Sequence, residues 1–219
     1  MRIDILTLFP HMFDGFLTES IIKRAIEKEK VKINIVDIRD YTPYKNNQVD
    51  DYQFGGGGGM IMMCEPVFNA VESVKDDDAY VILLTPRGKT YNEKKAYEFK
   101  DKKHLIIICG HYEGFDERIY TLADELVSIG NYILTGGEIP AMAIADSVTR
   151  LIDGVLTDTS LEYESFNDNL LDYPVYTKPR VFRGMEVPEV LVNGNHKLIN
   201  EYRENERKRI TKEYRDDLL

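Results

Sequence analysis

The fold is indicated by three apolar runs near the middle of the chain: VILLTPRG (residues 81–88), LIIICGHYEG (105–114) and YILTGGEIPA (132–141). Each run contains apolar residues rich in Val, Ile and Leu without polar alternation, which is typical of a strand covered on both faces of a parallel sheet. Helix-like segments separate the runs. We therefore predict an α/β fold with a mostly parallel sheet and helices on both faces.

Each run also ends in a loop of small or conformationally tolerant residues, at 86–88, 110–114 and 136–137. Ligands of open parallel sheets bind outside the carboxyl ends of the strands, so we expect the three loops to form one site. Glycine exposes backbone N–H and C=O groups that a Cβ would shield, a geometry suited to the edge of a base such as adenine. The pattern predicts a nucleoside-containing cofactor.

Two alternatives bear on these loops. Any βα protein needs such turns, and for a single loop that interpretation is the better one; three convergent loops are harder to explain in this way. No loop has the glycine spacing G-x-G-x-x-G or the P-loop pattern G-x-x-x-x-G-K-[ST], which disfavours an ordinary dinucleotide or P-loop site. We infer that the cofactor is not held by its phosphates.

Composition indicates an ordinary soluble protein with one large domain or two unequal ones, because 43% of its 219 residues are hydrophobic and 30% are charged. The N-terminus carries Asp4 inside its first apolar stretch and has no small-residue cleavage site, and no later run approaches the about 20 apolar residues of a membrane span. We expect a cytoplasmic protein. Cys64 and Cys109 lack metal-ligand spacing, so neither a disulfide nor a zinc site is predicted.

The charge balance argues against indiscriminate nucleic-acid binding, because 38 acidic and 28 basic residues give a net charge of −10. A nucleic-acid partner would have to meet local basic patches. The candidates are Lys178, Arg180 and Arg183, and the tail residues Arg203, Arg207, Lys208, Arg209, Lys212 and Arg215. The tail is also rich in Glu, and charge-mixed helices are more often solvated faces than binding surfaces.

The first half of the chain predicts strands at 5–9 and 31–38, with a helix between them that Ser20 caps. Five consecutive glycines at 55–59 exclude helix or strand interior. A linker is one interpretation of this stretch. A Met-rich run and a helix from about Glu65 follow at once, so we favour a mobile lid or wall beside the site.

The second half predicts a helix from Pro140 to Ile152, with Arg150 near its end. Taken alone, Arg150 is best interpreted as structural, because Asp146 lies one turn earlier and a cation suits a helix C-terminus. A polar stretch without periodicity, 158–169, marks a domain boundary. A further helix is expected from about His196.

Several strings of the chain resemble the bacterial tRNA (guanine-N1)-methyltransferase family, in order and with similar spacing from Met1 to about Tyr202. They are LFPHMFDGF (8–16), VDDYQFGGGGGMIMM (49–63), CGHYEGFDERI (109–119), SIGNYILTGGEIPAMAIADSVTRLIDGVL (128–156), ESFNDNLLDYPVYTKP (164–179) and GMEVPEVLVNGNH (184–196).

The resemblance implies an α/β domain with a deep trefoil knot, a feature nearly absent from other folds. It implies a homodimer with active sites between subunits, and methyl transfer from S-adenosylmethionine to N1 of the guanosine immediately 3′ to the anticodon of tRNA. It also implies three parts: a knotted cofactor-binding domain at 1–155, an interdomain linker at 156–169 and a small, shortened, mainly helical tRNA-binding domain at 170–219.

Carried over by motif, the resemblance assigns a general base to Glu164 and a guanine-stabilising role to Arg150. It also implies Mg²⁺ near the donor, with Glu113 and the linker carboxylate as neighbours, although residue spacing predicts no metal ligand set. The cofactor-binding residues implied are Leu83, Leu84, Thr85, Pro86, Arg87, Gly110, Tyr112, Glu113, Ile129, Gly130, Asn131, Tyr132, Ile133, Leu134, Gly136, Gly137 and Pro140.

The chain departs from the family pattern at a few positions. Glu164 stands where the family usually has Asp, in a linker about one residue shorter; Asn131 also replaces an Asp, and Tyr202 replaces a Trp. The family's tail continues beyond Leu219, so we expect either weaker tRNA binding or a greater reliance of the dimer on Arg180, Arg183 and the glycine loop. Rival interpretations are a knotted ribose 2′-O-methyltransferase, a non-catalytic RNA-binding relative and a nicotinamide-dependent oxidoreductase. The chain lacks the glycine fingerprint of the last class.

Overall fold

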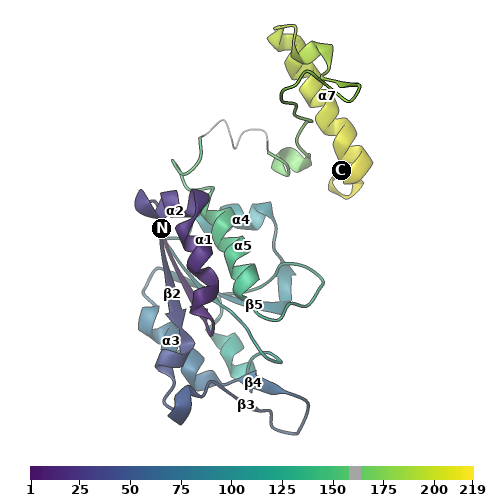
Figure 1. Cartoon of the computed structure of the whole chain (residues 1–219). Helices are drawn as coiled ribbons and strands as arrows, with labels where there is room; N and C mark the ends of the chain where they lie inside the picture. The colour runs from purple at the N-terminus through teal and green to yellow at the C-terminus, as the bar shows by residue number, and fades with distance from the viewer. Residues whose placement is uncertain (158–163) are drawn as a thin grey trace. The chain divides into compact units, whose positions relative to one another are not determined.

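The computed structural model describes residues 1–157 and 164–219 and divides into two compact units, Met1–Leu156 and Thr157–Leu219. Part of the predicted linker, 158–163, lies outside the described residues (Figure 1). No helix in the described ranges is both long and apolar enough to cross a membrane.

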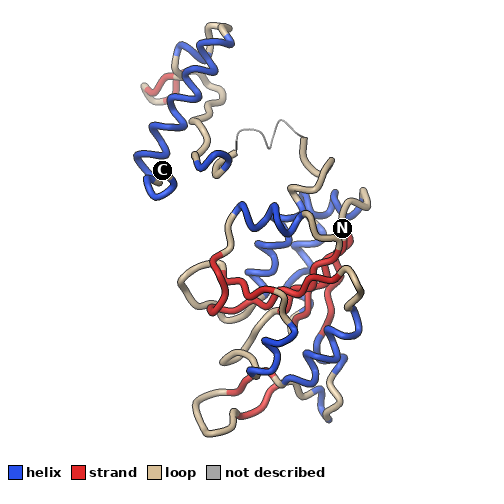
Figure 2. Tube along the Cα trace, turned by 180° about the vertical axis from the view of Figure 1, so that it is seen from behind, coloured by secondary structure: helices blue, strands red, loops and turns tan. Residues whose placement is uncertain are grey.

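The first unit is built on a five-stranded parallel sheet in the order β2-β1-β6-β5-β7 (Figures 1 and 2). The strands are β1 (Arg2–Thr7), β2 (Lys32–Asp37), β5 (Ala79–Thr90), β6 (His104–Ile108) and β7 (Glu125–Ser128). The central strand β6 is buried along its whole length, as expected from the apolar run that follows His104. The predicted α/β fold with a mostly parallel sheet is confirmed.

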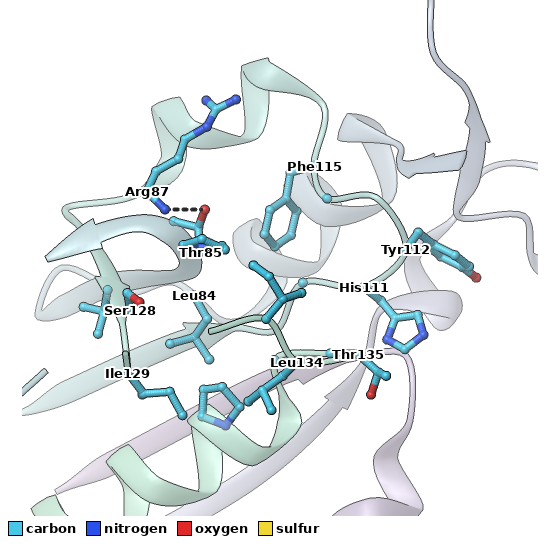
Figure 3. A pocket seen from close by; sticks show the side chains of 18 of the residues that line it. Leu84, Thr85, Arg87, His111, Tyr112, Phe115, Ser128, Ile129, Leu134 and Thr135 are labelled. Carbon is cyan, nitrogen blue, oxygen red and sulfur yellow. Dashed lines mark hydrogen bonds between the residues drawn. The ribbon is translucent and has the colours of Figure 1, made fainter. Parts of the chain in front are cut away.

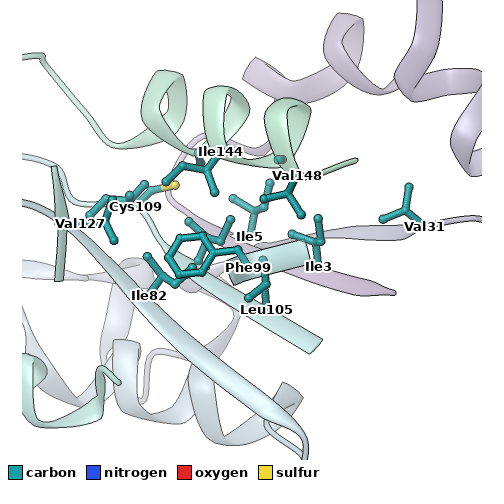
Figure 4. Packing of buried hydrophobic residues seen from close by; sticks show 14 of the residues in the cluster. Ile3, Ile5, Val31, Ile82, Phe99, Leu105, Cys109, Val127, Ile144 and Val148 are labelled. Atoms are coloured by element: carbon teal, nitrogen blue, oxygen red, sulfur yellow. The ribbon is translucent and has the colours of Figure 1, made fainter. Parts of the chain in front are cut away.

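Helices cover both faces of the sheet. On one face α2 (Ser20–Glu27), α4 (Glu93–Lys100) and α5 (Glu138–Thr149) pack over alternate strand residues, where Ile144 and Val148 meet Ile3 and Ile5 (Figure 4). On the other face α3 (Cys64–Val74) and the 3-10 helix η4 (Glu117–Leu122) cover a second cluster that includes Leu83. Both faces of the sheet are therefore buried away from water, which explains the lack of polar alternation in the strands.

Smaller elements fill the connections of the first unit. They are the helix α1 (Asp14–Thr18), the 3-10 helices η1 (Pro10–Phe13), η2 (Ile38–Tyr41) and η3 (Lys45–Asn47), and the antiparallel strands β3 (Asp50–Tyr52) and β4 (Met60–Met62). The five glycines form the loop between β3 and β4, and four of them, at 55, 56, 57 and 59, have positive φ. The loop therefore needs glycine, as the sequence predicted.

Strand β5 leaves the sheet and returns to it. It pairs with β7 through Leu84 and Val127, and then again through Lys89 and the same Val127. Residues 85–88 bulge out between these two pairings. At the return point a Cβ on Gly88 would lie 2.3 Å from the Val127 backbone nitrogen, so only glycine lets the two chains pass.

The predicted strand at 132–134 is wrong. These residues lie in an irregular loop, where the Ile133 side chain is 79% exposed, and the strand beside β5 is β7, at 125–128. The chain leaves the sheet after Ser128 and turns at Gly130, where φ is 158°. An apolar run without polar alternation indicates a buried strand only where a covering layer exists.

Two helix starts also differ from prediction. Glu19 rather than Ser20 occupies the N-cap of α2, without a side-chain hydrogen bond, and Ser20 has a φ of 53°. Helix α5 begins at Glu138, so Pro140 is its third residue; proline is tolerated there because first-turn N–H groups have no intrahelical partner.

The second unit contains a short hairpin, a long helix and single turns of 3-10 helix. They are β8 (Val181–Phe182), β9 (Met185–Glu186), α7 (His196–Tyr214), η5 (Asn167–Asn169), η6 (Glu189–Leu191) and η7 (Asp216–Leu218). The predicted helix from His196 is confirmed. Asn195 caps it by accepting a hydrogen bond from the Leu198 N–H at 3.3 Å.

A buried polar network lies where β1 and β6 begin. Asp4 is fully buried and contacts the Arg2 guanidinium at 2.6 Å and His104 Nε2 at 2.8 Å. The other ring nitrogen of His104 lies 2.9 Å from the Asp76 carboxylate. Carboxylates on both sides of one imidazole make this network the polar anchor of the sheet end opposite the three loops.

We expect Asp76→Asn to remove part of the acid sensitivity of folding. The hydrogen bond from His104 lowers the pKa of Asp76 below its model-peptide value of 3.8. A depressed carboxyl pKa adds stability above about pH 4, and that stability is lost as the pH falls through the folded-state pKa. Urea midpoints of the parent and the variant should differ at pH 6 and converge towards pH 2. A constant difference would contradict the assignment.

Candidate functional site

A cavity of about 530 Å³ opens beside the bulge of β5 and the carboxyl ends of β6 and β7 (Figure 3). Three segments line it, 84–87, 110–115 and 127–137 without Asn131, together with Tyr120 and Pro140. The volume suits a ligand the size of a nucleoside derivative. The predicted convergence of the three loops on one cavity is what the structure shows.

The first segment is the bulge of β5. The Thr85 hydroxyl accepts a hydrogen bond from the Arg87 backbone N–H at 3.3 Å and lies 3.3 Å from the Tyr120 hydroxyl (Figure 3). The Arg87 guanidinium stacks on the Tyr120 ring at 4.5 Å and bonds Glu117 at 2.7 Å. These contacts hold the bulge open beside the cavity.

The second segment follows β6. A Cβ on Gly110 would lie 2.8 Å from the Phe115 ring, so glycine leaves room for that ring at the cavity. His111 packs against Phe9 with the ring centroids 4.6 Å apart, and its buried Nδ1 has no hydrogen-bond partner within the described residues. An unpaired buried polar atom is costly, so one facing a cavity indicates a place for a ligand's polar group.

The glycine loop is tied to this second segment. Strand β4, directly after the glycines, donates from the Met62 N–H to the Gly114 carbonyl at 2.8 Å and accepts at Met60 from the Glu113 N–H at 3.0 Å. A Cβ on Gly59 would meet the Glu113 side chain at 2.5 Å. The glycine loop therefore stands beside a residue that lines the cavity, and its role as a lid stays a prediction.

The third segment connects β7 to α5. The Gly137 N–H donates to the Gly110 carbonyl at 2.8 Å, which joins the second and third segments. A Cβ on Gly137 would lie 2.7 Å from the Cys109 Cα, so the two backbones touch. Tyr132 and Ile133 are more than half exposed on the rim.

A buried carboxylate lies behind these glycines. Glu138, the first residue of α5, is 2% exposed and accepts a hydrogen bond from the Thr7 hydroxyl at 2.8 Å. The same hydroxyl accepts from the Phe9 N–H at 2.9 Å. Burial raises the pKa of the neighbouring Cys109 thiol well above its usual value, and the charge of Glu138 adds to that effect.

A family model described as tRNA (guanine-1)-methyltransferase TrmD matches residues 1–219. The chain belongs to this family. It is 51% identical to a tRNA (guanine-N(1)-)-methyltransferase of Ureaplasma urealyticum over 219 residues, covering all of this chain and 96% of the relative. Proteins of the same name from Geobacillus kaustophilus and Clostridioides difficile are 54% and 51% identical over the whole chain, which covers 91% and 97% of them.

The TrmD resemblance identified most of the residues that line the cavity. Of the residues implied as cofactor-binding, Leu83 and Asn131 do not line it: Leu83 is fully buried in the core, and Asn131 is exposed on the loop. Seven lining residues were not identified. They are His111, Gly114, Phe115, Tyr120, Val127, Ser128 and Thr135. Most of these residues are next in sequence to residues that the resemblance implied. Their position within the same motifs is therefore the sequence signal that could have identified them.

The two residues implied as catalytic by the TrmD resemblance lie in different units. Arg150 is the C-cap of α5, where its backbone N–H donates to the Asp146 carbonyl at 3.0 Å. Glu164 is half-buried in the second unit, directly after 158–163. Their roles stay predictions.

Proposed function

We propose that this chain transfers a methyl group from S-adenosylmethionine to N1 of the guanosine immediately 3′ to the anticodon of tRNA. The observation that carries the proposal is the cavity formed by three glycine-bearing segments in a chain that matches the tRNA (guanine-1)-methyltransferase family along its whole length. The family supplies the reaction, and the cavity supplies a place for the methyl donor.

The residues at the cavity fit such a donor. Glycines contribute main chain to the cavity lining, and at Gly110 and Gly137 a Cβ would collide with neighbouring protein atoms. The Gly110 carbonyl and the Gly137 N–H pair with each other, so we assign contacts with a base edge to other main-chain groups of the lining segments and to the unpartnered Nδ1 of His111. S-adenosylmethionine would supply an electrophilic methyl carbon on a positively charged sulfur.

The chain's own residues then have to make guanine N1 a nucleophile, because N1 carries a proton at neutral pH. We assign proton removal to Glu164 as general base. Negative charge develops on guanine O6 as the proton leaves, and we assign its stabilisation to the guanidinium of Arg150. Both roles rest on the family motif.

The described residues do not supply a metal site. No three His, Cys, Asp or Glu side chains in the described ranges are grouped to hold an ion. Mg²⁺ usually keeps several waters and few protein ligands. We propose Glu113 as a side chain that would contact the ion near the donor. We assign no chemical step to Mg²⁺.

The homodimer and the knot are part of the proposal. Tyr132, Ile133 and Ile139 are each more than half exposed at or beside the cavity rim. Apolar surface of this kind is typical of a protein interface, which supports a partner subunit that completes the site. The knot in this proposal rests on the family resemblance.

For the RNA we propose contacts from the second unit. Lys178 and Arg180 line a cavity of about 450 Å³ there, together with Arg203 and with aromatic and apolar side chains. Arg203 stacks on Tyr173 at 4.6 Å. Cations beside aromatic rings suit a nucleic-acid strand, and they offer local positive charge on a chain of net charge −10.

The test uses the purified chain with methyl-labelled S-adenosylmethionine, Mg²⁺ and an unmodified tRNA that has guanosine after the anticodon. We expect label in N1-methylguanosine, and none in the same tRNA with that base changed. Equal labelling of both RNAs would refute the assigned specificity. Label on a ribose 2′-hydroxyl would indicate a knotted ribose 2′-O-methyltransferase. Absence of cofactor binding would indicate a non-catalytic RNA-binding relative.

A further inference from the structure

Glu138 differs from the other buried acid of the molecule. Among residues 1–157 and 164–219, the acidic side chains that are buried are Asp4 and Glu138. Asp4 faces the cation Arg2 and His104. Glu138 forms no salt bridge within this part of the chain, and its hydrogen-bond partner is the neutral hydroxyl of Thr7.

Two features of the fold interact with the Glu138 carboxylate. It is the first residue of α5, where the helix dipole stabilises an anion, and the Thr7 hydroxyl donates to it. Water reaches it poorly, since it is 2% exposed. Its charge is therefore only weakly screened and reaches further than that of a surface carboxylate.

The Glu138 carboxylate lies next to residues that line the cavity. A Cβ on Gly136 would lie 2.3 Å from Glu138 Oε2 and 2.8 Å from His111 Nδ1. Gly136, Gly137 and His111 all line the cavity. Because residue 136 is glycine, no side chain at that position separates the carboxylate from the cavity, and the ring of His111 lies beside it.

We propose that Glu138 supplies the negative charge by which the pocket distinguishes S-adenosylmethionine from its product S-adenosylhomocysteine. The inference rests on the proposed function. Donor and product share the nucleoside and the amino acid, and they differ in one methyl group and in the positive charge on sulfur. A buried carboxylate behind glycine attracts the cationic donor and leaves the neutral thioether unaffected.

Other charges at the cavity are weaker candidates. Arg87 points its guanidinium to Glu117 and Tyr120, and its side chain is 58% exposed. Glu113 is also exposed. Solvent and salt screen exposed charges, so their effect on a ligand inside the cavity is smaller than that of Glu138.

The experiment measures the affinity of the full chain for each ligand by calorimetric titration at pH 8, where histidine side chains in general are neutral. Glu138→Gln keeps the shape and can still accept the Thr7 hydrogen bond. We expect it to weaken S-adenosylmethionine binding about tenfold, or about 1.4 kcal/mol, and S-adenosylhomocysteine binding less than about twofold. Equal loss for both ligands, or loss for neither, would overturn the proposal.

Thr7→Val is the matched control, because it disrupts the same buried hydrogen bond and keeps the charge. It should lower the unfolding midpoint and leave the ratio of the two affinities unchanged. A tenfold fall of that ratio in Thr7→Val would mean that Glu138 acts only through the structure, which would contradict the proposal. If Glu138→Gln does not fold, the double variant Thr7→Val with Glu138→Met removes both partners of the hydrogen bond. This costs less stability than leaving one buried partner without a hydrogen bond. The same ratio is then measured.

The outcomes separate this proposal from the function on which it rests. If the parent chain binds neither ligand, the proposed function fails. If the parent binds S-adenosylmethionine and the ratio of affinities survives Glu138→Gln, the proposed function stands and the role of Glu138 is refuted.

Discussion

Glu164→Gln lowers the single-turnover rate of methyl transfer to tRNA by about 10²- to 10⁴-fold, the usual contribution of a general base. The amide of glutamine cannot take the proton that guanine N1 carries at neutral pH. The substitution changes neither the length nor the shape of the side chain. We therefore expect the dissociation constants for tRNA and for S-adenosylmethionine to change little.

The rate is measured in a rapid-quench assay with enzyme in excess over labelled tRNA, so that product release does not contribute. Asp168→Asn is the control, because Asp168 is an exposed carboxylate four positions further along the chain. Its φ of 55° lies in the left-handed region, which asparagine also tolerates. This control should react at the parent rate. A Glu164→Gln enzyme as fast as the parent would remove Glu164 from the mechanism.

Gly88→Ala is expected to have the largest effect on stability, about 3 kcal/mol or more. The added Cβ would lie 2.3 Å from the backbone nitrogen and 2.4 Å from the carbonyl carbon of Val127. A flexible side chain could move aside, but these are backbone atoms of β7. The strand has to separate from β5, and the pairing of Lys89 with Val127 is lost with it.

Urea unfolding at pH 7 measures this effect, with Gly15→Ala as the control. Gly15 lies in α1 and has nothing within 4 Å of the added Cβ. Alanine is favoured over glycine inside a helix by about 0.5–1 kcal/mol, so the control should be as stable as the parent or slightly more stable. If the two variants unfold at the same urea concentration, the close approach of β5 and β7 is not what requires glycine.

The sheet could be predicted from sequence because its strands are buried on both faces. In β6, five consecutive apolar-rich positions, 104–108, are all buried, and no helix pattern competes with that run. The loop chemistry was equally informative. Gly110 and Gly137 now lie in contact through a hydrogen bond, as expected for loops that follow neighbouring strands.

The edge strand β7 could not be predicted in the same way. It has four residues and begins with Glu125, whose carboxylate is neutralised by Lys95 at 2.9 Å and bonded by the Tyr80 hydroxyl at 3.0 Å. Both partners come from other elements, so the local sequence gives no sign of them. The apolar residues at 132–134, which did look like a strand, lie on the cavity rim instead.

The site was predicted unevenly. The loops carry a backbone argument, but nothing in the pattern around Glu164 or Arg150 predicts catalysis, and only the family motif singles them out. The sequence alone does not distinguish Glu138, because an acid in the first turn of a helix is ordinary. Its burial and its contact with Thr7, 131 positions earlier, exist only after β1 and β6 have paired.

The glycine-built walls of the cavity also bear on inhibition. A compound held by the main chain at the glycine positions would contact atoms that substitution cannot change. Resistance to such a compound would have to arise at side chains that line the cavity, such as Phe115 and Tyr120, or through a change that reshapes a loop. A change that reshapes a loop would also weaken binding of the natural ligand, so few substitutions would give resistance.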